Sequence, residues 1–446
     1  MTGRALELGA AMGRSSLRAT AAAGLATLVI GVTGAGPAQA AGLTTSRVSV
    51  SSAGAQGYRS SEGPSLSANG RYVAFASLAR NLVPGDTNLV EDVFVRDRSA
   101  GTTRRVSLGA GGTQANGASS MPSISDDGRY VAFMSDATNL VTGDTNHTTD
   151  IFVRDLVTGI NQRVSAGSGG QQANGASSFP SLSRDGLHVA FLSAASNLVA
   201  GDTNGTFDVF VRDRLANVTQ RISVGPGGVQ GNDASLYPAV SGDGRFVAFI
   251  SDATNLVSGD VNGSSDAFVR DRLNGTTRRV SVGAGGVEAN RLTGNAPSIS
   301  ADGRFVAFDS SASNLVPGDT NGIQDIFVRD LQAKTTTRVS VGAGGVEANG
   351  ISISPTLSTD GRFVAFSSDA TNLVNADTNG LHDVFVTDRL AGTTRRASVG
   401  PGGVQGNGPS FGTAVSTDGA HVGFVSNATN LVAGDTNGEM DVFVRD

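Results

Sequence analysis

One segment of about 58 residues recurs seven times along the chain, and this repeat constrains the fold more than any other feature. Each copy contains an Asp-Gly-Arg-like turn, and the glycines of successive turns are 58 or 59 residues apart. These glycines are Gly70, Gly128, Gly186, Gly244, Gly303, Gly361 and Gly419. A fixed period of this length predicts a solenoid, a propeller or another array of stacked units.

Within a repeat, apolar residues alternate with a period of two, which is typical of strands. In the second repeat we expect strands at 122–125, 130–135, 151–155 and 161–165, with a long loop at 136–149. No stretch of the repeat has the length or spacing of a helix. Four antiparallel strands per repeat predict a propeller blade. The alternative is a β-solenoid, whose coils usually repeat at about half this length or less.

The two ends of the chain indicate how a ring would close. The seventh repeat stops after its third strand, at Asp441–Asp446. The missing fourth strand has the form seen at Thr276–Val282, and similar residues occur at Thr44–Val50. We therefore expect an all-β protein, a seven-bladed β-propeller of four-stranded antiparallel blades. Its N-terminal strand should pair within the last blade and remove an exposed sheet edge.

The predicted core is also repeated. Fourteen of the 20 phenylalanines occupy two positions of the repeat, one in the second strand and one in the third. They are Phe75, Phe133, Phe191, Phe249, Phe308, Phe366 and Phe424, and Phe94, Phe152, Phe210, Phe268, Phe327, Phe385 and Phe443. We expect each to be buried between neighbouring blades and to contribute roughly 1.5–3 kcal/mol.

The first 40 residues resemble an export signal. Arg4, Arg14 and Arg18 precede the apolar stretch Ala19–Val32, which is too short to span a membrane as a helix, and Ala38–Ala40 forms a cleavage site. We expect a signal peptide at 1–40 and one propeller domain at 41–446; the alternative is an uncleaved N-terminal anchor. The mature protein should be secreted, or periplasmic if its source has an outer membrane, with no transmembrane segment after cleavage.

Composition excludes several classes of protein. The formal net charge is -6, which argues against a nucleic-acid partner, and the absence of cysteine excludes a disulfide scaffold. The content of Val, Leu, Ile and Phe is too high for a disordered chain. We expect a monomer whose fold is held by its core alone.

The string Pro-Ser-x-Ser-x-Asp-Gly-Arg-x-Val-Ala-Phe-x-Ser, as at Pro297–Ser310, resembles the WD-type β-propeller repeat of the TolB-like family. The resemblance covers all seven repeats, with Asn69 in place of the Asp, and Leu187 and Ala420 in place of the Arg. It implies a propeller fold and a scaffold role, and leaves the ligand open. TolB itself carries an extra N-terminal domain, for which this chain has no room, so the resemblance does not extend to its partners.

Two long loops per repeat, 136–149 and 167–179 in the second, should emerge on one face of the propeller, where function usually resides. The residue before the repeated proline varies, and we place it in a loop at the channel mouth. These residues are Gly63, Met121, Phe179, Tyr237, Ala296, Ser354 and Gly412. The variation suits a binding surface, and drift at exposed positions explains it equally well. We predict a ligand face that includes Met121, Phe179, Tyr237 and Arg291.

Catalysis has little support in the sequence. The histidines His147, His188, His382 and His421 form no repeated cluster, and no Gly-x-Ser-x-Gly or His-Glu-x-x-His motif occurs. His188 and His421 share one position of the repeat, where buried packing is expected. Carboxylate chemistry on a polysaccharide stays open because Asp is abundant. However, sugar sites favour Trp and Tyr, and this chain has no Trp and four Tyr.

Two further repeated patterns favour structural roles. The Arg-Asp dipeptide after the third strand, as in Arg96-Asp97 and Arg154-Asp155, is interpreted as a structural charge pair, with an anion-binding ring as the alternative. The repeated loop asparagine, as in Asn81 and Asn139, is expected to hydrogen-bond local backbone.

Every repeat also carries Asp-x-Asn-x-x-x-Asp, which offers oxygen ligands for calcium. The residues are Asp86, Asn88 and Asp92; Asp144, Asn146 and Asp150; Asp202, Asn204 and Asp208; Asp260, Asn262 and Asp266; Asp319, Asn321 and Asp325; Asp377, Asn379 and Asp383; Asp435, Asn437 and Asp441. The match is partial, because the acidic residue at position five and the bidentate Glu are missing. The alternative is turn chemistry that needs no metal.

Together these features predict an exported propeller scaffold that binds a protein or a cell-envelope or extracellular ligand through its long-loop face. We do not expect an enzyme. The alternative is an extracellular polysaccharide lyase or hydrolase that uses the loop carboxylates.

Overall fold

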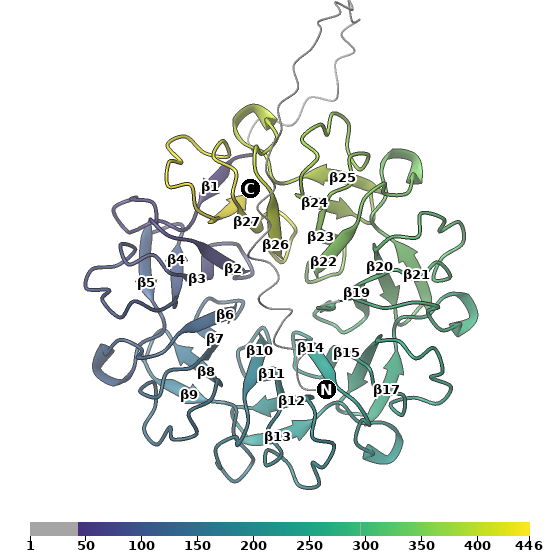
Figure 1. Ribbon diagram of the computed structural model, residues 1–446, viewed down its shortest axis with the longest axis horizontal. Coiled ribbons are helices and arrows are strands. Elements are labelled where there is room, and N and C mark those ends of the chain that lie inside the picture. Colours follow the sequence, from purple (N-terminus) through teal and green to yellow (C-terminus); the bar gives the residue numbers. More distant parts are fainter. Residues whose placement is uncertain (1–42, 295) are drawn as a thin grey trace, which may run out of the picture. The chain divides into compact units, whose positions relative to one another are not determined.

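The computed structural model describes residues 43–294 and 296–446, and these form seven four-stranded antiparallel sheets arranged in a ring (Figure 1). The first four blades have these strands: β2 (Ser61–Leu66), β3 (Tyr72–Ser77), β4 (Asp92–Asp97) and β5 (Thr102–Arg105); β6 (Ser119–Ile124), β7 (Tyr130–Ser135), β8 (Asp150–Asp155) and β9 (Asn161–Arg163); β10 (Ser177–Leu182), β11 (His188–Ser193), β12 (Asp208–Asp213) and β13 (Val218–Arg221); β14 (Ser235–Val240), β15 (Phe246–Ser251), β16 (Asp266–Asp271) and β17 (Thr276–Arg279).

The remaining blades contain β18 (Ser298–Ile299), β19 (Phe305–Ser310), β20 (Asp325–Asp330) and β21 (Thr335–Arg338); β22 (Ser352–Leu357), β23 (Phe363–Ser368), β24 (Asp383–Asp388) and β25 (Thr393–Arg396); β26 (Ser410–Val415), β27 (Val422–Ser426), β28 (Asp441–Arg445) and β1 (Thr45–Arg47). The helices of the described residues are three-residue 3-10 turns in the long loops. They span Ala110–Gly112, Pro226–Gly228, Ala284–Gly286, Ala343–Gly345 and Pro401–Gly403. None of the described helices is long and apolar enough to cross a membrane.

The seventh blade is completed by the N-terminal strand, as the sequence predicts. Its sheet has the order β1-β28-β27-β26, and Ser46 lies opposite Val444 in the antiparallel register. The pairing gives the backbone of β28 a partner on both sides, because β27 lies on its other edge. The seven-bladed propeller and its closure are therefore confirmed.

The core lies between successive blades. Phe133 and Phe152 face each other across β7 and β8 with ring centroids 6.0 Å apart, and both are fully buried. They belong to a cluster that also contains Val93 and Val95 from β4 of the preceding blade. The alternation of each strand thus sends one set of side chains into each of its two seams, as the repeated phenylalanines predict.

The turn glycine of each repeat also serves the preceding blade. Gly303 has a φ of +71°, and a Cβ on it would overlap the ring of Phe246, which belongs to the preceding blade. A Cβ on Gly128 would likewise overlap Tyr72 of the first blade. A Cβ on Gly70 would overlap His421 of the seventh blade, so this contact also occurs where the first and last blades meet. Glycine is therefore required here both for the turn conformation and for the close approach of an aromatic ring.

The innermost strands differ from the sequence-based expectation. β6 begins at Ser119, three residues before the expected start, because Met121 and Pro122 form a bulge inside the strand. The variable residue before the proline was expected in a loop, but in six of the seven blades the structure places it within the innermost strand at this bulge; Ala296 of the fifth blade instead precedes β18. The bulge residue has a left-handed backbone, with φ of 51° at Met121, 53° at Phe179 and 51° at Tyr237.

Candidate functional site

The two long loops of each repeat lie on the same face and are tied together by side chains. Asn139 Nδ2 donates to the carbonyl of Gln114 (2.8 Å), and its Oδ1 accepts from the backbone N–H of Asn116 (3.1 Å). Asn139 is in the loop between β7 and β8, whereas Gln114 and Asn116 are in the loop that enters this blade. The asparagine therefore bonds the backbone of a second loop rather than its local backbone, and the pairing fixes the face.

An arginine from the fourth strand lies between the two aspartates of each Asp-x-Asn-x-x-x-Asp loop. In the first blade Arg105 Nη1 is 3.5 Å from Asp86 and 3.1 Å from Asp92. The seven arginines lie 3.0–4.0 Å from their aspartates: Arg47, Arg105, Arg163, Arg221, Arg279, Arg338 and Arg396. The guanidinium therefore supplies positive charge at the position where calcium was expected.

The asparagine of these loops also has partners within the protein. Asn88 Nδ2 donates to Asp92 Oδ2 (2.9 Å) and to the carbonyl of Ala115 (3.1 Å). In the equivalent loop of the fourth blade, Asn262 Oδ1 accepts from the backbone N–H of Ser264 (2.9 Å). These are the Asx-turn contacts of the metal-free alternative. Calcium binding stays a prediction, and it would require displacement of the arginine.

The fourth and fifth blades have a third carboxylate at this position. Glu288 and Glu347 replace the glutamine of the other blades, and each is ion-paired with the arginine of its cluster, Arg279 or Arg338. Asp260, Asp266 and Glu288 have carboxylate oxygens within 4.8 Å of one another. Burial raises the pKa of Asp266 to about 6, against the opposing effect of the contacts with Ser281 and Arg279.

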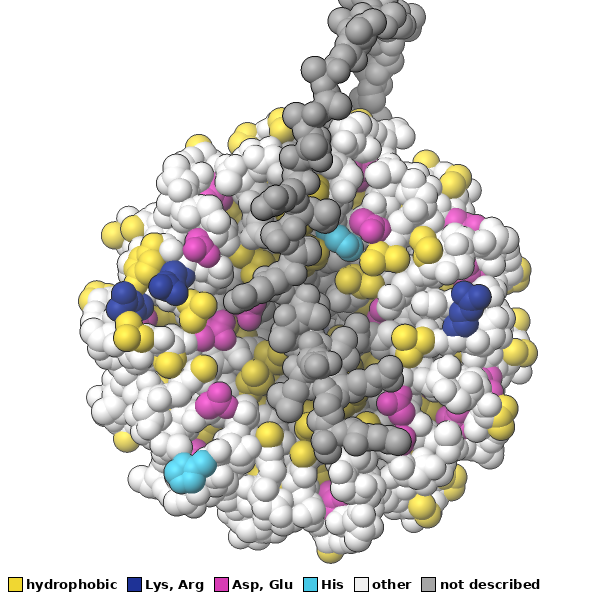
Figure 2. Space-filling view, in the orientation of Figure 1, with side chains coloured by type: hydrophobic (Ala, Val, Ile, Leu, Met, Phe, Trp, Pro, Cys, Tyr) yellow, Lys and Arg dark blue, Asp and Glu magenta, His cyan; other side chains and the backbone are white. Residues whose placement is uncertain are grey.

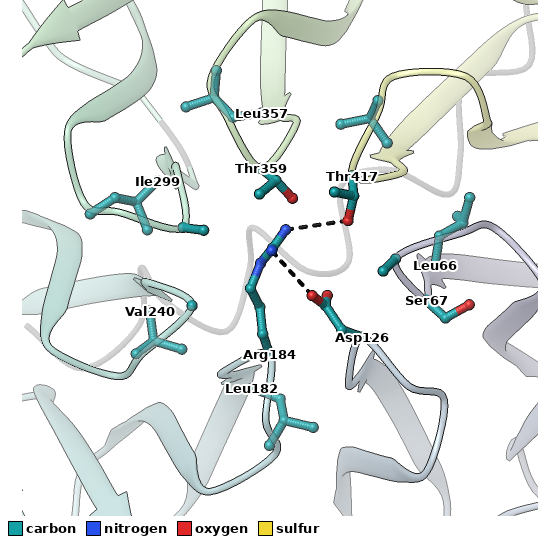
Figure 3. A pocket seen from close by; sticks show the side chains of 14 residues that line it. Leu66, Ser67, Asp126, Leu182, Arg184, Val240, Ile299, Leu357, Thr359 and Thr417 are labelled. Atoms are coloured by element: carbon teal, nitrogen blue, oxygen red, sulfur yellow. Dashed lines mark hydrogen bonds and ion pairs between the residues drawn. The ribbon is translucent and has the colours of Figure 1, made fainter.

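The channel is narrow at the end formed by the Asp-Gly turns. Backbone hydrogen bonds join these turns from blade to blade, for example from Ala68 N–H to the carbonyl of Asp126 (3.0 Å). Arg184 extends across the axis: Nη1 is 3.2 Å from Asp126 Oδ2, and Nη2 donates to Thr417 Oγ1 (3.3 Å) (Figure 3). These side chains line a cavity of about 120 Å³. Arg184 thus partly obstructs this end.

Apolar side chains at the ends of the innermost strands form a belt that lines this cavity (Figure 3). Each belt residue is the last residue of its strand. The belt residues are Leu66, Leu182, Val240, Ile299, Leu357 and Val415. The residue before the repeated proline lies on the long-loop side of the belt in each blade. Together these bulge residues form what we call the mouth.

Large side chains occupy only one part of the mouth. Met121, Phe179 and Tyr237 come from three consecutive blades, whereas the other bulge residues are Gly, Ala or Ser. The rings of Phe179 and Tyr237 meet edge to face with centroids 4.9 Å apart. Met121 is 37% exposed. We call Met121, Phe179 and Tyr237 the apolar arc.

Arg291, the fourth predicted ligand-face residue, is exposed in the loop that enters the fifth blade. The same is true of Asp233 in the loop before β14, and of His147 in the loop before β8. No hydrogen bond or ion pair joins these three side chains within residues 43–294 and 296–446. Asp233 instead accepts from the N–H of Ala234 (2.8 Å).

The repeated Arg-Asp dipeptide is not a pair of mutual partners. Asp97 is held by Arg71 of the Asp-Gly-Arg-like turn, through Nε–Oδ1 (3.0 Å) and Nη2–Oδ2 (2.7 Å) contacts. Arg96 instead donates to the carbonyl of Ser51 in the preceding loop (3.0 Å). Hydrogen bonding by Arg71 lowers the pKa of Asp97 to about 2. The dipeptide is structural, as expected, but its partners lie elsewhere in the sequence.

The fourth-strand arginines that lie between the loop aspartates, such as Arg105, were missed by the sequence analysis, as was Arg184. A signal for the fourth-strand arginines exists, because an arginine recurs at one position of the fourth strand in all seven repeats. Arg184 and Asp126 occupy the same variable position of the Asp-Gly turn in two different repeats. They lie close together only because the blades form a ring, which the sequence of a single repeat does not show.

No protein-family model and no curated protein sequence matches the chain. Among solved structures it is similar to oligogalacturonate lyase from Vibrio parahaemolyticus, with 13% identity, 87% of this chain and 89% of that chain covered, and a TM-score of 0.50. It is also similar to acylaminoacyl peptidase from Pyrococcus horikoshii, with 11% identity, 87% and 51% covered, and a TM-score of 0.51.

TolB from Acinetobacter baumannii is a further structural match, at 16% identity and a TM-score of 0.38. The match covers 68% of this chain and spans 61% of the TolB chain. A TolB-like protein from Agrobacterium tumefaciens is a second match of this kind, with 17% identity and a TM-score of 0.38. At these identities the likeness concerns the fold, which is a seven-bladed β-propeller.

Proposed function

We propose that the protein is an exported propeller scaffold that binds a protein or a cell-envelope ligand through its long-loop face. The observation that carries the proposal is the apolar arc: three large side chains at a position that is small in the other blades. A purely structural ring would have no need for this asymmetry. Function on a rigid scaffold usually resides in such irregular positions and in the loops beside them.

The rigidity of the long loops supports a preformed binding surface. Asn139 and Asn116 join neighbouring loops, and Gln114 also accepts from the N–H of Thr87 (3.0 Å). A face held in this way loses little conformational entropy when it binds a partner.

The loop carboxylates are ion-paired and hydrogen-bonded within the protein, which favours binding over catalysis. The enzyme alternative assigned chemistry to aspartates such as Asp86 and Asp92, but both lie against Arg105, and Asp92 also accepts from Asn88. A carboxylate that is already ion-paired and hydrogen-bonded is poorly placed to exchange protons with a substrate.

Export is the second part of the proposal and rests on the signal sequence, which lies outside the described residues. Cleavage after Ala40 would give a mature protein that begins at Ala41. N-terminal sequencing of protein from the culture medium or periplasm tests this directly. Protein that begins at Met1 would contradict export by cleavage.

The binding face can be tested by site-specific photo-crosslinking. A photoreactive residue replaces His147 or Asp233 on the long-loop face, and in matched controls it replaces Leu215 or Leu273, which are exposed in turns at the other end of the blades. Each variant is incubated with the culture supernatant or envelope fraction of the native source. We expect adducts of one defined mass from the long-loop positions alone. Equal labelling from both ends, or none from His147 and Asp233, would contradict the proposal.

A further inference from the structure

Acidic side chains border the apolar arc on the long-loop face. Glu62 is exposed in β2, next to the bulge residue of the first blade, and Asp233 is exposed four residues before Tyr237. On the face shown in Figure 2, Asp and Glu side chains are distributed between the centre and the rim, whereas Lys and Arg side chains appear in a few places near the edge. Glu62 and Asp233 therefore place negative charge beside the arc.

Glu91 adds a third carboxylate near the strand that carries Met121. Its carbonyl accepts from the N–H of Ser119, the first residue of the next innermost strand (2.8 Å). The equivalent residue of the sixth blade, His382, packs its ring 5.2 Å from that of Phe411, which directly precedes the next bulge residue. Glu91 occupies the equivalent position of the first blade, directly before β4.

Burial and two neighbouring carboxylates govern the ionisation of Glu91. Burial raises the pKa of Glu91 to about 8, and the charges that add to this effect are those of Glu62 and Asp92, both negative. A positive group brought by a partner would favour the ionised carboxylate.

From this arrangement we infer that the mouth binds a polypeptide segment in which apolar side chains alternate with lysine or arginine. Met121, Phe179 and Tyr237 would receive the apolar side chains, and Glu62 and Asp233 would attract the basic ones. Glu91 would ionise when a basic group binds beside it. The charge around the arc selects this partner over an acidic one, because like charges at an interface cost affinity. The inference rests on the proposed function, since it specifies the ligand of the same face.

The segment must reach the mouth from the long-loop side. At the other end of the channel, Arg184 crosses the axis to Asp126 and Thr417. At that end Arg184 and Asp126 neutralise each other as an ion pair. An apolar and basic segment is therefore complementary to the mouth and not to the opposite end.

The test uses the full secreted protein and three synthetic peptides: Lys-Phe-Lys-Phe-Lys, Glu-Phe-Glu-Phe-Glu and Lys-Ser-Lys-Ser-Lys. Titration calorimetry should give an affinity for the first peptide at least about tenfold above that for either of the others. This affinity should fall as salt is raised. Absence of binding by the first peptide, or equal binding of either control peptide, would overturn the inference.

Substitutions by residues that other blades carry at the same position should fold normally, so they separate loss of binding from loss of structure. Phe179→Gly and Tyr237→Ser introduce residues found at the same left-handed position in other blades, namely Gly63 and Ser354. Together they should weaken Lys-Phe-Lys-Phe-Lys at least about tenfold, as should the double variant Glu62→Gln/Glu91→Gln. Leu215→Ser/Leu273→Ser at the other end should leave the affinity unchanged. Unchanged affinity in the mouth variants would overturn the assignment of this site.

Failure of this inference can be separated from failure of the proposed function. If photo-crosslinking from His147 or Asp233 identifies a partner whose bound segment has no basic residue, the long-loop face is a binding face but the inferred ligand class is wrong. If no partner is attached from these positions, the proposed function itself fails.

Discussion

His421 Nδ1 lies 2.7 Å from Asp446 Oδ1, in a blade where alanine has replaced the arginine of the Asp-Gly-Arg turn. The third blade shows the same exchange: Leu187 replaces the arginine, and His188 Nε2 lies 3.6 Å from Asp213. In the first blade the equivalent aspartate, Asp97, is held by Arg71. Where the arginine is lost, a histidine at the neighbouring position therefore lies beside the carboxylate, and in the seventh blade it is within hydrogen-bond distance of it.

This exchange predicts a pH-dependent stability for the third blade. Burial, together with the charge of Arg272, lowers the pKa of His188 below its usual value. The folded state thus disfavours the protonated ring, so stability is fully present above about pH 6.5 and falls as the unfolded chain takes up the proton below it. Leu187→Arg/His188→Phe restores the Arg-Phe sequence of the fourth blade. The variant should lose less stability than the wild type between pH 7 and 5, measured by urea denaturation; an identical loss in both proteins would contradict this role.

The seam between blades makes a prediction about two glycines. Gly303→Ala and Gly318→Ala both place a Cβ on a left-handed backbone, at φ of +71° and +75°, which costs about 1–3 kcal/mol in each case. A Cβ at Gly303 would also overlap Phe246 of the neighbouring blade, whereas nothing lies within 4 Å of one at Gly318. Gly303→Ala should therefore be less stable than the control by about a further 1–3 kcal/mol. Equal free energies of unfolding would show that the seam adjusts freely.

Calcium binding by the Asp-x-Asn-x-x-x-Asp loops predicts a melting temperature that rises with millimolar CaCl₂ and falls with EDTA. The structure adds that calcium would have to displace Arg279 from Asp260 and Asp266. Arg279→Gln removes this competitor and should enlarge the rise with calcium. If neither CaCl₂ nor EDTA changes the melting temperature of the wild type or of the variant, the loops do not bind calcium and the arginines alone balance their charge.

Deletion of residues 43–51 should destabilise the seventh blade and promote aggregation. The deletion removes β1, and with it the partner of Val442, Phe443 and Val444. An unpaired strand of this kind is a template for pairing with another chain. Light scattering and thermal melting should show larger particles and a lower melting temperature. A monomer of unchanged melting temperature would show that β1 contributes nothing to the ring.

The strands and the core of the propeller were predictable from the sequence. Period-two alternation and the repeated Phe75 and Phe94 positions predicted the strands and the core, because both depend on neighbours that every repeat shares. The bulge at Met121 was misplaced into a loop, since a left-handed backbone at Met, Phe or Tyr has no signal in residue type. The partner of Asp97 was missed because Arg71 lies 26 residues before it and comes close only when β3 pairs with β4.

The candidate site was predicted less completely than the fold. Met121, Phe179 and Tyr237 were identified from their variation among the repeats, but their grouping depends on the order of blades around the ring. Arg291 was expected at the same face and is exposed there, without contact to His147 or Asp233. The crossing of the channel by Arg184 required contacts between blades that lie on opposite sides of the axis.

The mouth exists as a single site only if the ring is closed by β1, and an engineered disulfide measures this most directly. The chain has no cysteine, so a pair introduced by Ser46→Cys and Val444→Cys has no competitor. These residues are directly opposite in the antiparallel register, within reach of a disulfide, whereas Ser46→Cys with Val442→Cys is offset by two residues, about 7–8 Å away. The account predicts an intramolecular disulfide in monomeric protein for the first pair alone. Disulfides that form only between molecules, or equally in the offset pair, would contradict the closed ring.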